Sequence, residues 1–447
     1  MSESKCDVVV IGAGAAGLAA AKRIAGFGLD VTVVEARDRV GGRIHTLRPS
    51  GWPAPVEAGA EFIHGLPAET WNAVRGAHLA VFEVSKNHWQ PSPGRPKPLE
   101  FEPIERNIFD RLDRIKGDDL SFDEFLRRHC TDATPEQIAH ATAFVEGFNA
   151  ADSRLVSTRW LHECESAMAR GEHSASFRIQ NGYDGVVDWL LAGLSPLSTR
   201  VLLSTVVSAV RWRPGRVEVD ALSATGESLE PIFATRAVVT LPLGVLRQDS
   251  NAHGAVRFIP DLAEKWGASS SLKMGPVVKL VLRFREMFWE ESGCEELGFL
   301  HAPQEPFPTW WTASPLRAPM LTAWAGGPAA ERLSGVEQRC ILTRALESLA
   351  RMLGTDRRRL TSLLDAWQLA DWKADPFARG AYSYVAVGPP NPSRRLAEPV
   401  AETLFFAGEA THDQLPGTVA GAIASGYRAA DEVLAACGRR QEHSSGR

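Results

Sequence analysis

The stretch from residue 7 to residue 43 constrains the fold more than any other part of this 447-residue chain. It begins with an apolar, β-branched run at 8–11, followed by an alanine-rich segment at 15–24 and a second β-branched run at 31–34. Runs that are apolar on both faces are typical of strands buried in a parallel sheet, and the segment between them consists mostly of good helix formers. The sequence therefore predicts a strand, a helix and a parallel strand in that order.

Three glycines join the first predicted strand to the helix, and each has a physical task. Gly12 makes the tight turn, Gly14 lets a pyrophosphate approach the backbone, and Gly17 lets helix and strand pack closely. The phosphates would lie at the helix N-terminus beside Ala15 and Ala16, where free N–H groups and the helix dipole favour an anion. A tight turn without a ligand is the alternative reading, and the complete order of elements argues against it.

The residues after the second strand favour one dinucleotide over the other. Glu35 ends that strand about 20 residues beyond the glycines, where a carboxylate can accept hydrogen bonds from an adenosine ribose. Arg37 follows, and then a second glycine turn that contains Gly42 and Arg43. This arrangement suits a cofactor that is held permanently along its whole length, so we expect FAD rather than an exchangeable nicotinamide.

Composition and length exclude several classes of protein. A net charge of −5 without a basic run gives no reason to expect nucleic acid or an anionic membrane as a partner. The six cysteines are scattered with no C-x-x-C pair, which indicates free thiols in a reducing compartment and no metal site. The first strand begins close to Met1, and no apolar run approaches the ~20 residues needed to span a bilayer. We expect a cytoplasmic protein without a signal peptide.

The chain is predicted to leave the nucleotide-binding domain twice and to return each time. A proline-rich loop at 91–98 begins the first excursion, and capping signals at Ser121 and Thr134 predict helices between 118 and 175. The chain returns to the nucleotide-binding domain with predicted strands at 202–212, 217–219 and 237–241. The second excursion contains a strand at 277–284 and a helix at 336–352. The chain then returns again with a strand at 404–409 and a helix at 417–430. We expect an α/β + α+β fold, with a discontinuous Rossmann-like FAD-binding domain of the glutathione-reductase type and a substrate-binding domain of mixed sheet and helices. The FAD-binding segments are 1–80, 179–260 and 395–438, the substrate-domain segments are 81–178 and 261–394, and a polar tail covers 439–447.

A few side chains outside the nucleotide motif are candidates for a site. His64 stands among small residues, although lone histidines are more often structural. Lys279 lies between apolar neighbours in the strand at 277–284, and the alternation of that strand predicts that it is half-buried. Burying a lysine is costly unless it is paired or neutral. Periodicity alone therefore favours a Lys279 side chain that reaches solvent. Three acidic residues would suit a cationic substrate, although exposed carboxylates are the commoner case; they are Glu146, Glu163 and Glu165.

Taken together, these motifs resemble those of the flavin-containing amine oxidases, the superfamily of monoamine oxidases, polyamine oxidases and lysine-specific histone demethylases. The resemblance implies an FAD-dependent enzyme that oxidises a primary or secondary amine, including a polyamine, by hydride transfer from the α carbon to flavin N5. The imine is hydrolysed, and O2 reoxidises the flavin to give hydrogen peroxide. The similarity covers nearly the whole chain and is carried by residues 12–17, 35–43, 59–65, 181–183, 240–246, Lys279 with 288–289, 372–388 and 406–412.

The same resemblance implies roles for individual side chains. Lys279 matches a lysine that holds a water beside flavin N5 and assists the reaction with oxygen, which replaces the interpretation from periodicity. Trp372 matches a tryptophan near the flavin ring, Tyr382 matches one wall of an aromatic cage for the amine, and His64 matches a position that touches substrate. Predicted cofactor-binding residues are Gly12, Gly14, Ala15, Ala16, Gly17, Glu35, Ala36, Arg37, Gly42, Arg43, Gly59, Ala60, Glu61, Val207, Trp372, Gly408, Glu409 and Thr418.

Two departures from the family pattern are informative. Ala381 occupies the place of the cysteine that bonds to the flavin in monoamine oxidases, so FAD is expected to be non-covalent. Thr418 stands in the place of the second cage tyrosine, and the motifs around it are most similar to those of the acetylpolyamine and spermine oxidase branch.

Two other functions stay open from the sequence. One is an FAD-binding scaffold or redox sensor without turnover. The other is a related flavin enzyme, such as an L-amino-acid oxidase or a desaturase. An amino-acid oxidase needs an arginine for the substrate carboxylate, for which Arg178, Arg283 and Arg317 are candidates. The identity of the amine and the oligomeric state are also left open.

Overall fold

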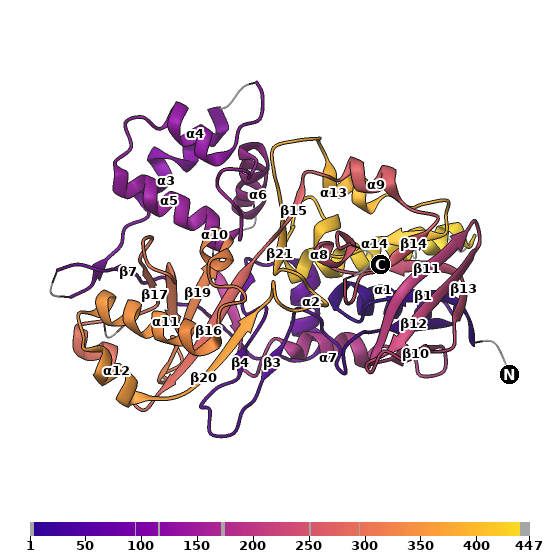
Figure 1. Ribbon diagram of the computed structural model, residues 1–447, viewed down its shortest axis with the longest axis horizontal. Coiled ribbons are helices and arrows are strands. Elements are labelled where there is room, and N and C mark those ends of the chain that lie inside the picture. Colours follow the sequence, from indigo (N-terminus) through magenta and orange to yellow (C-terminus); the bar gives the residue numbers. More distant parts are fainter. Residues whose placement is uncertain are drawn as a thin grey trace, which may run out of the picture.

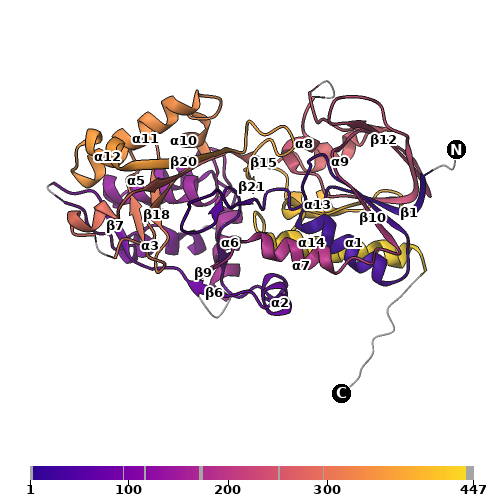
Figure 2. The same cartoon turned by 90° about the horizontal axis from the view of Figure 1, so that it is seen from below.

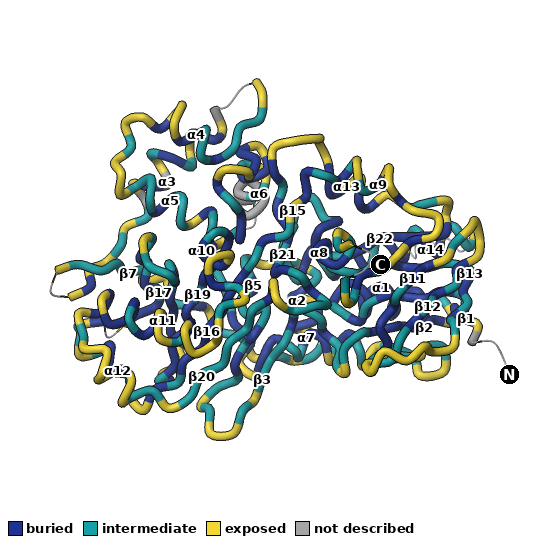
Figure 3. Tube along the Cα trace, viewed as in Figure 1, coloured by how far each residue is buried: buried dark blue, intermediate teal, exposed yellow. Residues whose placement is uncertain are grey.

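The computed structural model describes residues 4–93, 95–114, 117–170, 175–249, 252–294 and 296–438. The predicted polar tail at 439–447 lies outside the described residues. Two large sheets lie toward opposite ends of the molecule's long axis (Figure 1). Buried stretches run through the interior of both sheets, and many of the outer connections are exposed (Figure 3).

The first sheet has eight strands in the order β10-β2-β1-β13-β12-β11-β14, with β22 also beside β13. Strands β10, β2, β1, β13 and β22 run parallel, and all four residues of β2 are buried, as predicted from their apolar runs. The strands are β1 (Ser4–Ile11), β2 (Val31–Val34), β10 (Thr199–Leu202), β11 (Thr205–Arg213), β12 (Arg216–Ser223), β13 (Ile232–Val239), β14 (Arg257–Ile259) and β22 (Leu404–Phe406).

The prediction of one strand at 202–212 is wrong, because the structure divides this segment between β10 and β11. The break lies at Ser204, whose φ of 50° is incompatible with a strand and whose N–H donates to the Arg37 carbonyl at 2.7 Å. The divided strand lets β10 pair with β2 while β11 pairs with β12 and β14 on the far side of the sheet.

Three helices cover one face of this sheet, and Figure 2 shows them side by side. They are α1 (Ala15–Gly26), α7 (Asp184–Ala192) and α14 (Val419–Ala436). Small residues of α1 and α14 allow close contact, since a Cβ on Gly426 would lie only 2.2 Å from the Ala16 carbonyl oxygen. The N-termini of α1 and α14 both point to the carboxyl ends of the parallel strands, where the predicted nucleotide site lies.

The second sheet has seven strands in the order β20-β16-β19-β18-β17-β7-β8. Strand β16 has the predicted bounds, but the expectation that it is half-buried is wrong because seven of its eight residues are buried. One face packs on α11 (Gln338–Leu353), and residues of the other face line a cavity. The strands are β7 (His88–Gln90), β8 (Lys97–Pro98), β16 (Val277–Phe284), β17 (Phe299–His301), β18 (Thr309–Thr312), β19 (Met320–Gly326) and β20 (Leu364–Asp371).

A cluster of helices lies beyond this sheet (Figure 1) and includes α3 (Glu102–Asn107), α4 (Phe122–His129), α5 (Pro135–Phe148) and α6 (Thr158–Arg170). Both predicted helix starts are confirmed, since Ser121 caps α4 and Thr134 forms a capping box with Gln137. The remaining α-helices are α2 (Ala68–Gly76), α8 (Leu243–Leu246), α9 (Ala263–Ala268), α10 (Gly327–Glu331), α12 (Arg357–Leu363) and α13 (Pro392–Ala397). The remaining strands are β3 (Thr46–Leu47), β4 (Val56–Glu57), β5 (Ile63–His64), β6 (Val81–Glu83), β9 (Ser176–Ile179), β15 (Leu272–Gly275) and β21 (Tyr382–Val385).

Each large sheet takes its strands from separate parts of the chain. The eight-stranded sheet uses residues from 4–34, 199–259 and 404–406, and the seven-stranded sheet uses residues from 88–98 and 277–371. These ranges fall inside the segments predicted for the two domains. We propose that each sheet forms the centre of one domain, with the boundaries given above.

Candidate active site

A cavity of about 940 Å³ lies between the two sheets. Its wall combines the carboxyl ends of the parallel strands and the N-termini of α1 and α14 with β16, β18, β19 and α5. Every residue to which the family resemblance gave a catalytic or cofactor-binding role lines this cavity except Gly17. Side chains from distant parts of the sequence are thus gathered around one space.

The glycine turn after β1 fits the task predicted for each residue. Gly12 has a φ of 108°, which L side chains rarely adopt, and a Cβ on Gly17 would lie 1.9 Å from the Gly12 carbonyl oxygen. Gly17 therefore serves helix packing and does not line the cavity. A Cβ on Gly14 would meet no atom within 4 Å, so the space above this residue is open for a phosphate group.

The acidic residue after β2 is held in place by the backbone. The carboxylate of Glu35 accepts hydrogen bonds from the Ala13 N–H at 2.9 Å and from the Arg37 N–H at 3.0 Å. This fixes the carboxylate at the cavity wall beside the glycine turn. The turn, the acid and the open space together fit the adenosine and pyrophosphate parts of FAD.

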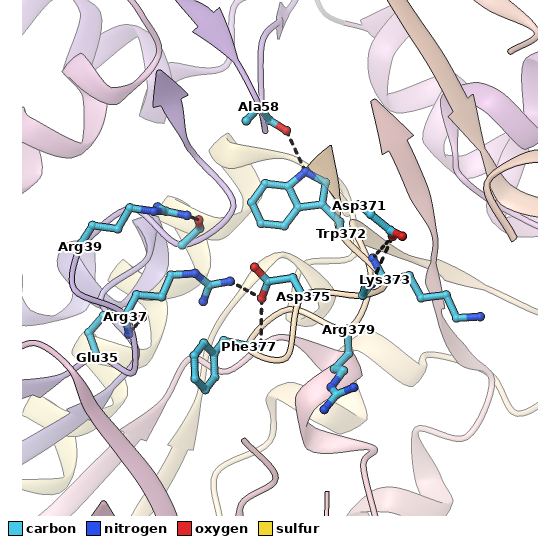
Figure 4. Close-up of polar contacts among 12 residues, drawn as sticks. Glu35, Arg37, Arg39, Ala58, Asp371, Trp372, Lys373, Asp375, Phe377 and Arg379 are labelled. Carbon is cyan, nitrogen blue, oxygen red and sulfur yellow. Dashed lines mark hydrogen bonds and ion pairs between the residues drawn. The ribbon is translucent and has the colours of Figure 1, made fainter. Parts of the chain in front are cut away.

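The loop after β20 lines the same cavity, and Figure 4 shows Asp375 and Phe377 of this loop beside Arg37. Arg37 forms an ion pair with Asp375 at 2.5 Å and lies 5.4 Å from the ring centre of Phe377. Trp372 lies 6% exposed in the cavity wall, and its indole N–H donates to the Ala58 carbonyl at 2.9 Å. The polar edge of Trp372 is therefore used inside the protein, which leaves its ring as a flat apolar surface.

Glu409 is buried, and its carboxylate forms hydrogen bonds with three separate segments of the cavity wall. Its carboxylate accepts hydrogen bonds from Arg43 Nη1 at 2.8 Å, from Ser383 Oγ at 2.7 Å and from the Gly417 N–H at 3.1 Å. Thr418 follows as the N-cap of α14, where its hydroxyl accepts from the N–H three residues later at 2.9 Å. Thr418 thus has a structural task at the start of α14.

Lys279 is almost completely buried, at 1% exposed, so the prediction from periodicity that its side chain reaches solvent is wrong. Its ammonium lies 2.6 Å from the Glu61 carboxylate and 3.3 Å from the Gly59 carbonyl oxygen. Glu61 also forms an ion pair with Arg178 at 2.7 Å and accepts from the Trp311 indole at 3.0 Å. Burial alone would raise the pKa of Glu61, but Lys279 and Arg178 hold it below its ordinary value.

Tyr382 and His64 lie in the part of the cavity wall nearest α5. The Tyr382 hydroxyl donates to the Phe148 carbonyl at 2.7 Å, and the His64 ring lies 5.2 Å from the Phe148 ring. The Nδ1 atom of His64 lies 2.9 Å from the Ser176 hydroxyl. Burial lowers the pKa of His64 to about 4, so this imidazole is neutral at pH 7.

The geometry agrees with a comparison against known families, in which a model described as flavin containing amine oxidoreductase matches residues 15–434. The chain belongs to the flavin containing amine oxidoreductases. Its cofactor is therefore a flavin, FAD, and the glycine turn, Glu35 and the cavity described above fit that group.

Individual relatives of this oxidoreductase differ in length and in name. The chain is 27% identical over 512 residues to lysine-specific histone demethylase 1 homolog 3 of Arabidopsis thaliana, across 96% of this chain but only 30% of that protein. It is 28% identical over 474 residues to polyamine oxidase 2 of the same plant, across 95% of this chain and 87% of that protein. Among solved structures, wild-type putrescine oxidase bound to putrescine has a TM-score of 0.78 at 21% identity, and the match covers 97% of this chain and 100% of the other.

Two of the acidic candidates, Glu146 and Glu163, and the three arginines considered for a substrate carboxylate do not line the cavity of this oxidoreductase. Glu146 accepts a hydrogen bond from Ser153 at 2.7 Å, Glu163 is exposed, and the side chain of Glu165 lies outside the described residues. Arg178 lies behind Glu61 and outside the cavity wall. The two other candidate arginines are engaged elsewhere: Arg283 pairs with Asp365, and Arg317 with Glu290.

The sequence did not indicate which aromatic residues form the rest of the cavity wall. Trp311 and Trp324 line it, whereas Trp310 is completely buried in the core of the seven-stranded sheet. The tryptophan-rich segment before residue 324 was a signal for aromatic packing, and strand alternation at 309–312 sends one of the paired tryptophans to each side.

In the described part of the chain, no helix combines the length and apolarity needed to cross a bilayer.

Proposed function

We propose that this oxidoreductase oxidises an amine to an imine, with O2 as the electron acceptor and hydrogen peroxide as the second product. Bound FAD would supply the two-electron acceptor for the hydride next to the amine nitrogen and would return the electrons to O2. The observation that carries the proposal is the buried Lys279, held by Glu61 in a cavity wall that also contains Trp372 and Tyr382.

The chain's own residues would perform three tasks in this reaction. The apolar rings of Trp372 and Tyr382 would exclude water and orient the C–H bond next to the nitrogen. The neutral His64 places no positive charge beside the substrate amine. Lys279 would hold a water and would stabilise negative charge that develops when oxygen is reduced in this low-dielectric space.

Non-covalent attachment of FAD is supported by Ala381, which lies in the cavity wall and offers only a methyl group. Its backbone carbonyl accepts from Arg43 at 2.6 Å, so this position belongs to the hydrogen-bonded frame around Glu409.

We also propose a cytoplasmic location, because none of the six cysteines, all of which are described, forms a disulfide.

The amino-acid oxidase alternative is less well supported. Arginines among the described wall residues are Arg37 and Arg43, and each is engaged by an acidic residue of this chain. Neither is left to bind a substrate carboxylate by itself. A scaffold without turnover has no evident use for a buried cation in the wall of its cavity.

Anaerobic mixing of the purified holoenzyme with a panel of amines tests the proposal. Bleaching of the oxidised flavin absorbance by at least one amine, followed by peroxide release on admission of air, is the expected result. If no amine in a panel of aryl, alkyl, diamine and polyamine compounds bleaches the flavin, the amine oxidase function is wrong.

A further inference from the structure

The cavity wall beyond Lys279 consists largely of aromatic rings. Trp324 and Trp311 lie 5.6 Å apart, Trp311 lies 6.2 Å from Phe299, and all three line the cavity. On the side formed by α5, Phe148 and Phe144 stack at 5.3 Å with an interplanar angle of 7°. These contacts form two rows of rings in the cavity wall.

The polar atoms of these rings are turned toward the protein. The indole N–H of Trp311 donates to Glu61 at 3.0 Å, and that of Trp324 donates to a backbone carbonyl of α5 at 2.9 Å. The Tyr382 hydroxyl donates to a neighbouring carbonyl of the same helix end at 2.7 Å. The apolar faces of these rings therefore face the cavity, and their hydrogen-bonding groups do not.

The carboxylates among the described wall residues are Glu35, Glu61 and Glu409, and each is already engaged. Backbone N–H groups hold the first, Lys279 with an arginine holds the second, and Arg43 with a serine and a backbone N–H holds the third. A second ammonium group on the substrate would thus meet none of these charges free to neutralise it. Leaving a cation unpaired in an apolar space is strongly unfavourable.

Histidines complete the outer wall without adding charge. His88 Nδ1 lies 2.9 Å from His301 Nε2, and the two rings stack with Phe299. Burial lowers the pKa of His88 to about 4, and burial together with the nearby His88 and His140 lowers the pKa of His301 well below 6.5. These imidazoles are therefore neutral at pH 7 and do not act as counter-ions of either sign.

We infer that the substrate is a monoamine with a bulky apolar body, of the arylalkylamine or cycloalkylamine class, and not a polyamine. This inference rests on the proposed function and decides a point on which the sequence motifs favour the polyamine branch. The single amino group would lie near Tyr382, and the apolar body would lie between the rows that contain Trp311 and Phe148. Burial of each ring or methylene against these walls removes apolar surface from water and so favours binding.

The first experiment compares rates of anaerobic flavin reduction by 2-phenylethylamine with those by putrescine and spermidine. We expect the second-order rate constant for 2-phenylethylamine to be at least roughly 100-fold higher, because only the polyamines carry an unpaired buried charge. Equal or faster reduction by either polyamine would overturn this inference and would leave the amine oxidase function intact. Failure of all amines would instead count against the proposed function.

A binding measurement separates fit from turnover. An arylalkylamine with two methyl groups on the carbon next to nitrogen has no hydride to give, so its effect on the flavin absorbance reports binding alone. The matched compound carries an aminopropyl chain in place of the phenyl ring. We expect the aryl compound to bind at least about tenfold more tightly, the equivalent of about 1.4 kcal/mol. Equal binding, tighter binding of the diamine, or no binding of the aryl compound would each contradict the inference.

A substitution can supply the missing carboxylate. Phe144 lines the cavity from α5 and is 37% exposed, so a smaller polar side chain can be accommodated there. We expect Phe144→Glu to raise the specificity constant for putrescine at least about tenfold over the matched neutral variant Phe144→Gln. Both variants should lose efficiency with 2-phenylethylamine. If the two variants treat putrescine alike, the charge deficit of the cavity is not what determines specificity.

Discussion

The ammonium of Lys279 lies 2.6 Å from the carboxylate of Glu61, which is 218 positions earlier in the chain. Arg178 is a second cation on the same carboxylate, at 2.7 Å. Removing the carboxylate of Glu61 would leave two uncompensated buried cations, whereas in the intact group their attraction to the carboxylate offsets the cost of desolvation. The same ion pair therefore contributes to the stability of the cavity wall and holds Lys279 in the position proposed for its reaction with oxygen.

The substitution Lys279→Met should affect oxygen more than amine. It keeps the length of the side chain and removes the cation, and Arg178 continues to compensate Glu61, so the variant should fold and retain FAD. We expect amine to reduce the flavin within about tenfold of the wild-type rate, and reoxidation by air to slow by one to three orders of magnitude, or roughly 1.4 to 4 kcal/mol of barrier. Stopped-flow measurement of the two half-reactions checks this. Equal reoxidation rates would mean that the lysine is only structural.

Replacing Glu61 by glutamine should destabilise the protein strongly. Lys279 and Arg178 would then both lose their carboxylate, so we expect a loss of about 3 to 5 kcal/mol, visible as a lower urea midpoint. The double variant Glu61→Gln with Lys279→Met should recover part of that loss, because one unpaired cation is gone. The exposed Glu163→Gln serves as control and should change stability by less than about 0.5 kcal/mol. An unchanged midpoint for Glu61→Gln would contradict the ion pair.

The glycine turn gives a prediction about cofactor loading. Gly14 has a φ of −77°, which valine can adopt, and a Cβ there meets no protein atom. Gly14→Val should therefore fold but occupy the space of the pyrophosphate, so the purified variant should lack FAD by absorbance. Gly26→Ala, where a Cβ also meets nothing and which lies at the other end of α1, should keep it. Stoichiometric FAD in Gly14→Val would show that the phosphates lie elsewhere.

Attachment of the cofactor is tested by acid precipitation. Because Ala381 offers no thiol, all the yellow chromophore should pass into the supernatant and be recovered as FAD. Colour that stays with the precipitated protein would show a covalent bond to another residue.

The pH dependence of stability should carry the signature of Glu57. Burial raises the pKa of this carboxyl from 4.5 to about 7, despite hydrogen bonds from the Tyr183 N–H and from Thr46. The folded state then binds more protons than the unfolded state between these values, so this group's stabilisation is complete below pH 4.5 and is lost as the pH rises through 7. Relative to Glu57→Gln, the wild type should lose on the order of 2 kcal/mol between pH 5 and pH 8. Parallel stability curves for the two proteins would refute the shift.

Short-range patterns in the amino-acid sequence are enough to predict the local features of this protein. The strand, glycine turn and helix at residues 8–24, the caps at Ser121 and Thr134, and the bounds of β16 could all be predicted because each depends on neighbours a few residues away. The turn at Ser204 was missed because its backbone hydrogen bond goes to Arg37, which is remote in sequence.

Only the tertiary structure decided the character of the cavity. Periodicity alone predicted that Lys279 reaches solvent, and the family resemblance placed it in a site without naming its partner. Packing placed Glu61 against it, and nothing in the local pattern around either residue specifies the other. In the same way, the aromatic rows of the wall combine β18, β19 and α5, and no local period records that their rings face a common space. Charge pairing and the shape of a cavity depend on contacts between residues hundreds of positions apart, and these contacts are set by the packing of the whole chain.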